Sequence, residues 1–446
     1  MGGGQPWSIG EVSVRELTRR HVLVPWASQA SLPHPVIDHG EGCWLYGPDG
    51  NRYLDLSSGL INVNVGHAHP HVVAAIERQA RRVAYVVPSF ATDVRALLAE
   101  KLAQYSPQGK LTKVFFTSGG AEANENAVKM ARLFTGRHKI LTAYRSYHGA
   151  TYGAVTLSGD NRRWAVEPGI PGVVHFFAPY PYRSPFRVPP EEQAVAALAH
   201  LEEVLLYEGP HTVAAMILEP IVGSDGLIVP PDGYLQGVRQ ICDRHGILLI
   251  LDEVMAGFGR TGRWFAAEHW NVVPDMITLA KGVTAGYVPL GGVLVHSRIA
   301  SYFDDHVLWG GLTYSGHALA CAAGMATLEV YEQEGLIERA ARMEAVLRGR
   351  LEELARRHPI IGDVRGKGLF FGVELVKDRA TKEPWVPWNS SNSGPTGRLL
   401  SIVMQKGVYL FGRWNMLFVA PPLTIREDEL DFGIRALDEA LSAVEP

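Results

Sequence analysis

Two stretches of this sequence, 247-ILLILDEV-254 and 276-MITLAKG-282, decide its fold. Each begins with a short apolar run and ends in charged side chains, Asp252 and Glu253 in the first stretch and Lys281 in the second. Runs this short are typical of buried strands, because a helix that crosses a bilayer needs about 20 apolar residues. We therefore expect two buried strands whose ends carry functional side chains.

The middle of the chain alternates further apolar runs with amphipathic segments. The strand-like runs are VFFT (114–117), KILTAY (139–144) and VAAMIL (213–218). Amphipathic segments such as DVRALLAEKLAQY (93–105) and NENAVKMARLF (124–134) lie between them. Strands that alternate with helices form a parallel or mostly parallel sheet covered on both faces. The fold class is therefore α/β.

The two ends of the chain predict a second, smaller α+β domain. A hairpin is expected over 43–56, a charged helical segment over 327–357, and a strand pattern over 366–376. A chain of 446 residues exceeds the roughly 250 to 300 residues at which a single core stops growing. We expect residues 1–64 and 331–446 to share the small domain and residues 65–330 to form the large one. The segment 383–397, rich in Pro, Ser, Asn and Gly, is expected to be an exposed loop and a lid.

Composition limits the partners of this chain. Lys and Arg total 42 against 46 Asp and Glu, and no run of like charges indicates a nucleic-acid or membrane surface. The cysteines Cys43, Cys242 and Cys321 are scattered, which favours a reducing compartment over disulfides or a thiolate metal site. The opening residues lack the apolar core of a signal peptide. We expect a cytoplasmic protein that acts on small molecules.

Four predicted strands end in polar or glycine-rich residues, which are expected to meet in one crevice. These ends are Ser118–Ala121, Glu219, Asp252 and Lys281. Ligand groups of an open α/β sheet collect at the carboxyl ends of its strands. The first end is a glycine-bearing turn before a helix that begins near Glu122, and such a turn presents free N–H groups to an anion such as phosphate.

Lys281 and Asp252 form the chemical core of this prediction. A buried ammonium is costly, and formation of an imine with an aldehyde removes that cost. An acid that closes a neighbouring strand can hold a proton on a pyridine nitrogen and keep the ring an acceptor of electrons. The alternatives without a catalytic role are that Lys281 extends to the surface and that Asp252 caps the end of its own strand.

Several motifs together resemble those of class III, or omega, aminotransferases, over nearly the whole chain. The motifs are FFTSGGAEANENAVKMAR (115–132), YRSYHGAT (144–151), EPIVGSDG (219–226), LDEVMAGFGRTGRW (251–264), LAKGVTAGYVPLGGVLV (279–295) and LTYSGHALACAA (312–323). The resemblance implies pyridoxal 5'-phosphate (PLP) as cofactor and fold type I, with a mostly parallel seven-stranded sheet in the large domain. It also implies a homodimer with shared active sites, while pairing of dimers into tetramers stays open.

The resemblance assigns roles around the cofactor ring. Lys281 matches the lysine that forms the Schiff base, and Asp252 matches the acid that pairs with the pyridine nitrogen. Tyr147 and Val254 match the residues that cover the two faces of the ring. Glu219 matches a residue that supports the ring environment through hydrogen bonds.

The resemblance also assigns a phosphate site. Gly119, Gly120 and Ala121 fall where family members bind the phosphate, and Thr313 matches a threonine that reaches it from the neighbouring subunit. The family's commoner pattern has hydroxyl residues in place of Gly119 and Ala121. Backbone N–H groups are therefore expected to do more of the binding here, with help from Ser118.

The substrate positions favour pyruvate as the acceptor. Relatives that use 2-oxoglutarate carry a glutamate at the position of Ser224, where it pairs with an arginine and neutralises it. Its absence resembles the taurine-pyruvate and amine-pyruvate group, whose donors are omega-amino acids, taurine-like compounds or primary amines. Arg413 is the expected clamp for a carboxylate, because guanidinium binds carboxylates with two hydrogen bonds. Ile61 stands where some amine-using relatives have tryptophan, so it is expected in the pocket wall.

Other functions remain open or are disfavoured. A relative that uses 2-oxoglutarate, an aminomutase, a racemase, a decarboxylase and a non-catalytic PLP-binding scaffold all fit the same fold. GFGRTG (257–262) matches the dinucleotide pattern GxGxxG, but it neither follows its strand directly nor opens a helix. The histidines His67, His69 and His71 invite a metal site, but a structural turn is favoured and no metal is expected.

Overall fold

The computed structural model describes residues 11–29, 35–390 and 394–444. Its central element is a seven-stranded sheet in the order β4-β10-β9-β8-β7-β5-β6. Only β10 runs antiparallel to its neighbours β4 and β9, so the sheet is mostly parallel, as expected. The strands are β4 (Leu111–Thr117), β5 (Lys139–Ala143), β6 (Val173–Phe176), β7 (Val213–Leu218), β8 (Leu248–Asp252), β9 (Met276–Leu279) and β10 (Gly291–His296).

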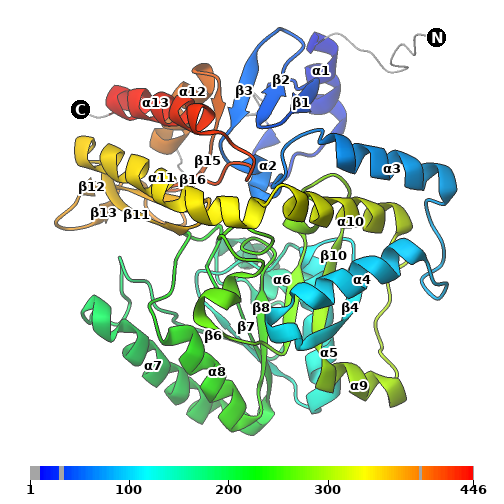
Figure 1. Cartoon of the computed structure of the whole chain (residues 1–446). Helices are drawn as coiled ribbons and strands as arrows, with labels where there is room; N and C mark the ends of the chain where they lie inside the picture. The colour runs from blue at the N-terminus through cyan, green and yellow to red at the C-terminus, as the bar shows by residue number, and fades with distance from the viewer. Residues whose placement is uncertain (1–10, 30–34, 391–393, 445–446) are drawn as a thin grey trace.

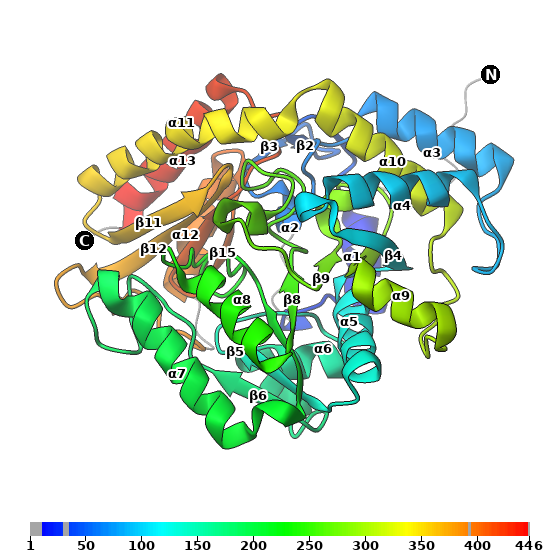
Figure 2. The same ribbon diagram turned by 60° about the horizontal axis from the view of Figure 1, so that its bottom comes forward.

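Helices cover both faces of this sheet because successive strand residues point to opposite sides. In β8, Leu249 and Leu251 pack into one apolar cluster with α7 and α8, whereas Leu248 and Ile250 pack into another with α5. Figure 2 shows α7 and α8 on one side of the sheet and α5 and α6 on the other. The helices of this region are α3 (Pro70–Arg82), α4 (Asp93–Tyr105), α5 (Gly120–Thr135), α6 (Tyr152–Leu157), α7 (Gln193–Glu208), α8 (Tyr234–His245), α9 (Ser297–Asp305) and α10 (Ala318–Gln333).

The two ends of the chain meet beside this sheet, as Figure 1 shows. The expected hairpin is present as β2 paired with β3, and β14 from the C-terminal part adds to β3 in parallel. A second sheet has the order β11-β12-β16-β15, with β13 paired to β12. The strands are β1 (His39–Glu41), β2 (Trp44–Tyr46), β3 (Arg52–Asp55), β11 (Ile361–Lys367), β12 (Phe370–Asp378), β13 (Glu383–Pro384), β14 (Val408–Tyr409), β15 (Phe411–Arg413) and β16 (Met416–Val419).

The remaining helices are α1 (Glu11–His21), α2 (Ser58–Ile61), α11 (Leu336–Arg357), α12 (Gly394–Gln405) and α13 (Glu427–Val444). The domain division at residue 330 stays a prediction, and that residue lies inside α10. The predicted loop over 383–397 contains β13 and the start of α12, while residues 391–393 lie outside the described residues. None of the helices within the described ranges has the length and apolarity that a bilayer crossing requires.

The GFGRTG segment has a structural role. It forms a turn in which Phe258 N donates to Trp264 O, at 2.6 Å, rather than the start of a helix. Arg260 is fully buried and donates to Asn64 Oδ1, at 2.6 Å, and to Pro421 O, at 2.5 Å. The guanidinium thus ties the segment after α2 to the C-terminal part of the chain, and the dinucleotide interpretation finds no support.

The histidines of the GHAHPH turn each contact a separate carboxylate. His67 lies 3.0 Å from Asp55, and the other two contacts are His69 with Glu334, at 2.8 Å, and His71 with Glu329, at 2.6 Å. Within the described ranges no group of three or more His, Cys, Asp or Glu residues is arranged to hold a metal ion. The turn therefore connects the start of α3 to β3 through His67 and to the C-terminal end of α10 through His69 and His71.

Candidate active site

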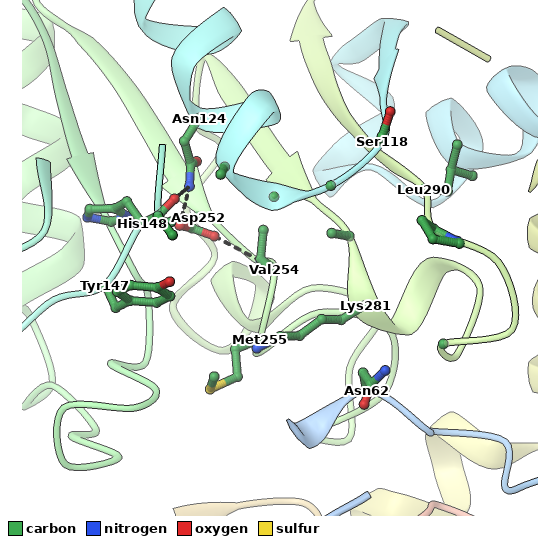
Figure 3. Close-up of a pocket in the computed structure, with 18 of the residues that line it drawn as sticks. Asn62, Ser118, Asn124, Tyr147, His148, Asp252, Val254, Met255, Lys281 and Leu290 are labelled. Atoms are coloured by element: carbon green, nitrogen blue, oxygen red, sulfur yellow. Dashed lines mark hydrogen bonds and ion pairs between the residues drawn. The ribbon is translucent and has the colours of Figure 1, made fainter. Parts of the chain in front are cut away.

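The four strand ends predicted to meet do surround one cavity. Its volume is about 480 Å³, within the range of small-molecule sites. Figure 3 shows side chains from several distant segments pointing into it. The polar and glycine residues that line it include Asn62, Ser118, Gly119, Gly120, Asn124, Tyr147, His148, Glu219, Ser224, Asp252, Lys281 and Thr284.

Lys281 enters this cavity from the end of β9. Its φ of +44° is in the left-handed region, which is uncommon for a residue with a side chain and costs energy that the surrounding fold must supply. Burial lowers the pKa of its amine to about 8, although Asp252 and Glu219 oppose that shift. A larger share of the amine is therefore neutral and nucleophilic near neutral pH than for an exposed lysine.

Asp252 is held by three hydrogen bonds at the end of β8. Its Oδ2 accepts from Asn124 Nδ2, at 2.8 Å, and contacts His148 Nδ1, at 2.8 Å. Its Oδ1 accepts from the backbone N–H of Val254, at 3.0 Å. Asn124 is itself fixed because its Oδ1 accepts from Thr278 Oγ1, at 2.6 Å. The carboxylate can therefore present one defined edge to a ligand in the cavity.

Two side chains border the space next to Asp252. In Figure 3, Tyr147 and Val254 lie on opposite sides of this space, as a slot for a planar ring requires. Glu219 supports one wall, because its Oε1 accepts from Tyr147 N, at 2.9 Å, and its Oε2 accepts from Gly223 N, at 2.8 Å. Burial raises the pKa of Glu219 to about 7. Glu219 thus holds the tyrosine segment in place.

The start of α5 forms the anion-binding part of the cavity. The helix begins at Gly120, two residues before the expected Glu122, and its first turn closes when Ala123 N donates to Gly119 O, at 3.1 Å. Ser118 N donates to Glu122 Oε2, at 2.8 Å, and the N–H groups in the first turn of the helix point to where an anion can bind. A side-chain carbon at Gly120 would come within 2.9 Å of Val254 Cγ2, whereas one at Gly119 would meet no atom within 4 Å. Glycine at 120 therefore lets the helix start approach the ring slot.

Comparison with known proteins identifies the family. The model of the class-III aminotransferase family matches residues 27–441. The chain belongs to the class III aminotransferases. A probable aminotransferase of Mycobacterium tuberculosis is 39% identical to this aminotransferase, covering 93% of this chain and 91% of the relative. The taurine–pyruvate aminotransferase of Bilophila wadsworthia is 37% identical, with coverages of 96% and 97%.

A solved structure supports both the fold and the cofactor. The taurine:2-oxoglutarate aminotransferase of Bifidobacterium kashiwanohense, in complex with PLP and glutamate, is 43% identical to this aminotransferase. It superimposes with a TM-score of 0.95 and covers 98% of this chain and 99% of that chain. The predicted enzyme class, fold type and cofactor are therefore confirmed.

The cavity of this aminotransferase fits PLP. The start of α5 can take the phosphate, the slot between Tyr147 and Val254 can take the ring, Asp252 can face the ring nitrogen, and Lys281 can reach the aldehyde. PLP, when bound, supplies an aldehyde that condenses with amines and a ring that accepts electrons. With PLP bound, Lys281 could carry a proton between the substrate carbon and the cofactor's aldehyde carbon, and Asp252 could hold a proton on the ring nitrogen.

Three predicted site residues do not line the cavity of the aminotransferase's own chain. Thr313 is exposed on the segment between α9 and α10. Ile61 has a φ of +58° and turns into the apolar core, so its neighbour Asn62 faces the cavity instead. Arg413 is bound to Asp160, at 3.0 Å, and to Asp225, at 3.2 Å. The roles assigned to these three residues stay predictions.

Sequence reasoning missed Arg162, the arginine that contacts the cavity wall of the aminotransferase. Its guanidinium carbon lies 3.4 Å from the ring centroid of Tyr147, and its Nη2 donates to Ser224 Oγ, at 3.0 Å. Arg162 also lowers the pKa of Lys281, although burial contributes more. Only its position shortly after the SYHG motif linked it to the site, and no spacing rule distinguishes it from the adjacent Arg163.

Proposed function

We propose that this aminotransferase moves an amino group from an omega-amino acid, a taurine-like donor or a primary amine to pyruvate. The observation that carries the proposal is the hydrogen bond from Arg162 to Ser224 at the cavity wall. Arg162 is already paired with Asp160, and the hydroxyl of Ser224 adds no charge, whereas a glutamate at this position would add a second carboxylate to the guanidinium. The absent glutamate favours pyruvate over 2-oxoglutarate.

Arg162 is the proposed binding group for the acid of a substrate. Its charge lies at the cavity wall through contacts with Tyr147 and Ser224, and guanidinium can bind a carboxylate or sulfonate with two parallel hydrogen bonds. The alternative is that Arg413 binds the acid directly. That role would require Arg413 to leave its two carboxylate partners, which are both fully buried.

A second copy of the chain is proposed to complete the phosphate site with Thr313. In support, Thr313 is exposed and does not line the cavity of its own chain. Large apolar side chains next to it are also exposed, with 72% for Trp309 and 60% for Tyr314. Exposed large apolar side chains that lie close together in the chain favour association between proteins. A cytoplasmic location is also proposed, because all three cysteines are free and buried.

A panel of donors and acceptors tests the proposed reaction. The PLP-loaded protein is incubated with β-alanine, taurine or 1-phenylethylamine together with pyruvate or 2-oxoglutarate. Alanine formed in step with donor loss supports the proposal, and glutamate formed in preference points to 2-oxoglutarate, the acceptor in the name of the 43% identical relative. Isomerised or decarboxylated donor without amino transfer contradicts it.

Borohydride reduction followed by peptide mapping tests the covalent site. The adduct is expected on Lys281, and Lys281→Ala should lose both the adduct and turnover. An adduct on another lysine, or normal turnover of the variant, would contradict the assignment. Turnover with any donor would exclude the alternative that the protein is a non-catalytic PLP-binding scaffold.

A further inference from the structure

A buried cluster of charges lies directly behind the cavity wall. It consists of Asp160, Arg162, Asp225 and Arg413, which we call the charge cluster. Asp160 Oδ2 accepts from Arg162 Nε, at 2.5 Å, and from Arg413 Nη1, at 3.0 Å. Arg413 Nη1 also lies 3.2 Å from Asp225 Oδ1. Both carboxylate side chains have an exposed fraction of 0%, so water does not reach these two carboxylates.

Asp160 fixes Arg162 in two ways. Its Oδ2 binds the guanidinium, and its Oδ1 accepts from the backbone N–H of Arg162, at 2.9 Å. A single carboxylate therefore sets both the start of the short helical turn that carries Arg162 and the direction of its side chain. Arg162 also contacts the cavity wall at Tyr147 and Ser224, and its guanidinium carbon lies 5.4 Å from the ring centroid of Trp26.

Arg413 reaches the same carboxylate from β15, which is distant in the sequence. Its Nη2 donates to Asn161 Oδ1, at 3.0 Å, and its guanidinium carbon lies 3.8 Å from the ring centroid of Trp414. These contacts hold Arg413 in the cluster and away from the cavity. Its charge is shared between Asp160 and Asp225.

The position of Asp160 depends on Arg413. Asp160 Oδ2 accepts from both Arg162 and Arg413. Without Arg413, this carboxylate would lose one of the two arginines that hold it, and Arg162 would be less firmly oriented. Asp225 also has a buried Oδ2 with no hydrogen-bond partner in the described part of the chain, and burial raises the pKa of its carboxyl to about 8.

We propose that Asp160 and Arg413 are positioning residues that set the preference for donors with an acid group. Asp160 orients Arg162 against Tyr147 and Ser224 at the cavity wall, and Arg413 holds Asp160 in place. Neither residue touches the substrate. This inference rests on the proposed function, in which Arg162 binds the acid of the donor.

The experiment compares donors with and without an acid group in the first half-reaction alone. PLP-loaded protein is mixed with taurine or with 1-phenylethylamine, and the loss of cofactor absorbance gives a second-order rate constant for each donor. Because no keto acid is present, the acid of the acceptor does not affect the ratio of the two constants. That ratio measures the preference for an acid group.

Asp160→Asn is expected to lower the ratio by about tenfold, because a charge-assisted contact that orients Arg162 is lost. Arg413→Met is also expected to lower the ratio of the two rate constants. Arg413→Lys keeps the charge but lacks the planar fork of donors that contacts Asp160, Asp225 and Asn161 together, so a smaller decrease is expected. If Asp160→Asn does not fold, the two Arg413 variants decide the question.

Asp275→Asn is the matched control. Asp275 is also buried between two arginines, Arg239 at 2.9 Å and Arg298 at 2.5 Å, but it precedes β9 and so lies at the opposite end of that strand from Lys281. Its substitution removes a similar ion pair and should leave the donor ratio unchanged. A ratio that falls equally in this control would overturn the inference, because general loss of stability would then explain the effect.

Calorimetric titration with ethanesulfonate adds a measurement independent of turnover. Binding is expected to weaken by about tenfold in Asp160→Asn and to be unaffected in Asp275→Asn. An unchanged donor ratio and unchanged anion binding in the Asp160 and Arg413 variants would overturn this inference alone. A wild-type protein that binds the anion but transfers no amino group would overturn only the proposed function.

Discussion

The imidazole of His148 and the carboxylate of Asp252 are in direct contact, with 2.8 Å between Nδ1 and Oδ2 and almost no exposure of either side chain to solvent. Asn124 donates to the same carboxylate oxygen, at 2.8 Å. The acid predicted to face the cofactor ring is therefore fixed by two neighbouring side chains of the cavity itself. Its orientation does not depend on the ligand, which is the arrangement that electrostatic preorganisation requires.

Removal of the charge of Asp252 should slow the reaction while the cofactor still binds. In Asp252→Asn the ring nitrogen loses the anion that keeps it protonated, and the first half-reaction is expected to slow by about 100-fold. Stopped-flow absorbance with a saturating donor measures this rate, and equilibrium dialysis measures how much PLP the variant retains. Near-normal turnover would contradict the role of Asp252.

The orientation of Asp252 can be tested separately from its charge. Asn124→Leu removes one hydrogen bond to the carboxylate and should slow the first half-reaction on the order of tenfold. Asn126→Leu is the control, because Asn126 lies on the same helix and its Nδ2 donates to the backbone oxygen of Glu122, at 2.8 Å, rather than to Asp252. Equal rates for the two variants would show that the effect arises from α5 as a whole.

The lowered pKa of Lys281 predicts how capture of PLP depends on pH. The neutral amine is the nucleophile, so the rate at which apoenzyme takes up PLP should rise as pH increases and level off above about pH 8. Absorbance at the visible band of the adduct measures the rate. Acetyl-lysine amide is the control amine, and its rate should continue to rise toward about pH 10.4. A similar continued rise for the protein would contradict a buried lysine.

The exposed apolar side chains near Thr313 should lie in a contact between two copies of the chain. A charge placed there, as in Trp309→Glu or Tyr314→Glu, is expected to produce monomers and to weaken binding of PLP, because each site would lose Thr313 of the other copy. Sedimentation velocity measures the association state and fluorescence titration measures binding of PLP. Leu206→Glu is the control, since Leu206 is similarly exposed, at 71%, but belongs to α7. A wild-type protein that sediments as a monomer with PLP bound would contradict the proposal.

The sequence by itself determined the sheet and the centre of the site. VAAMIL (213–218) coincides with β7, and Asp252 and Lys281 line one cavity because parallel strands place their carboxyl ends at one edge of the sheet. This part was predictable because strand patterns and strand-end residues are local features. The start of α5 at Gly120 rather than Glu122 is a small difference, since helix boundaries depend on how the first turn closes.

Only the tertiary structure decided which side chains flank this centre. Ile61 and Asn62 are adjacent, yet a left-handed backbone at Ile61 directs the first into the core and the second into the cavity. The sequence predicts Arg413 as the clamp, whereas the structure places Arg162 against Tyr147 and Ser224 and places Arg413 between Asp160 and Asp225. Such placements depend on contacts between segments up to about 250 residues apart, for which strand and helix periodicity carries no information.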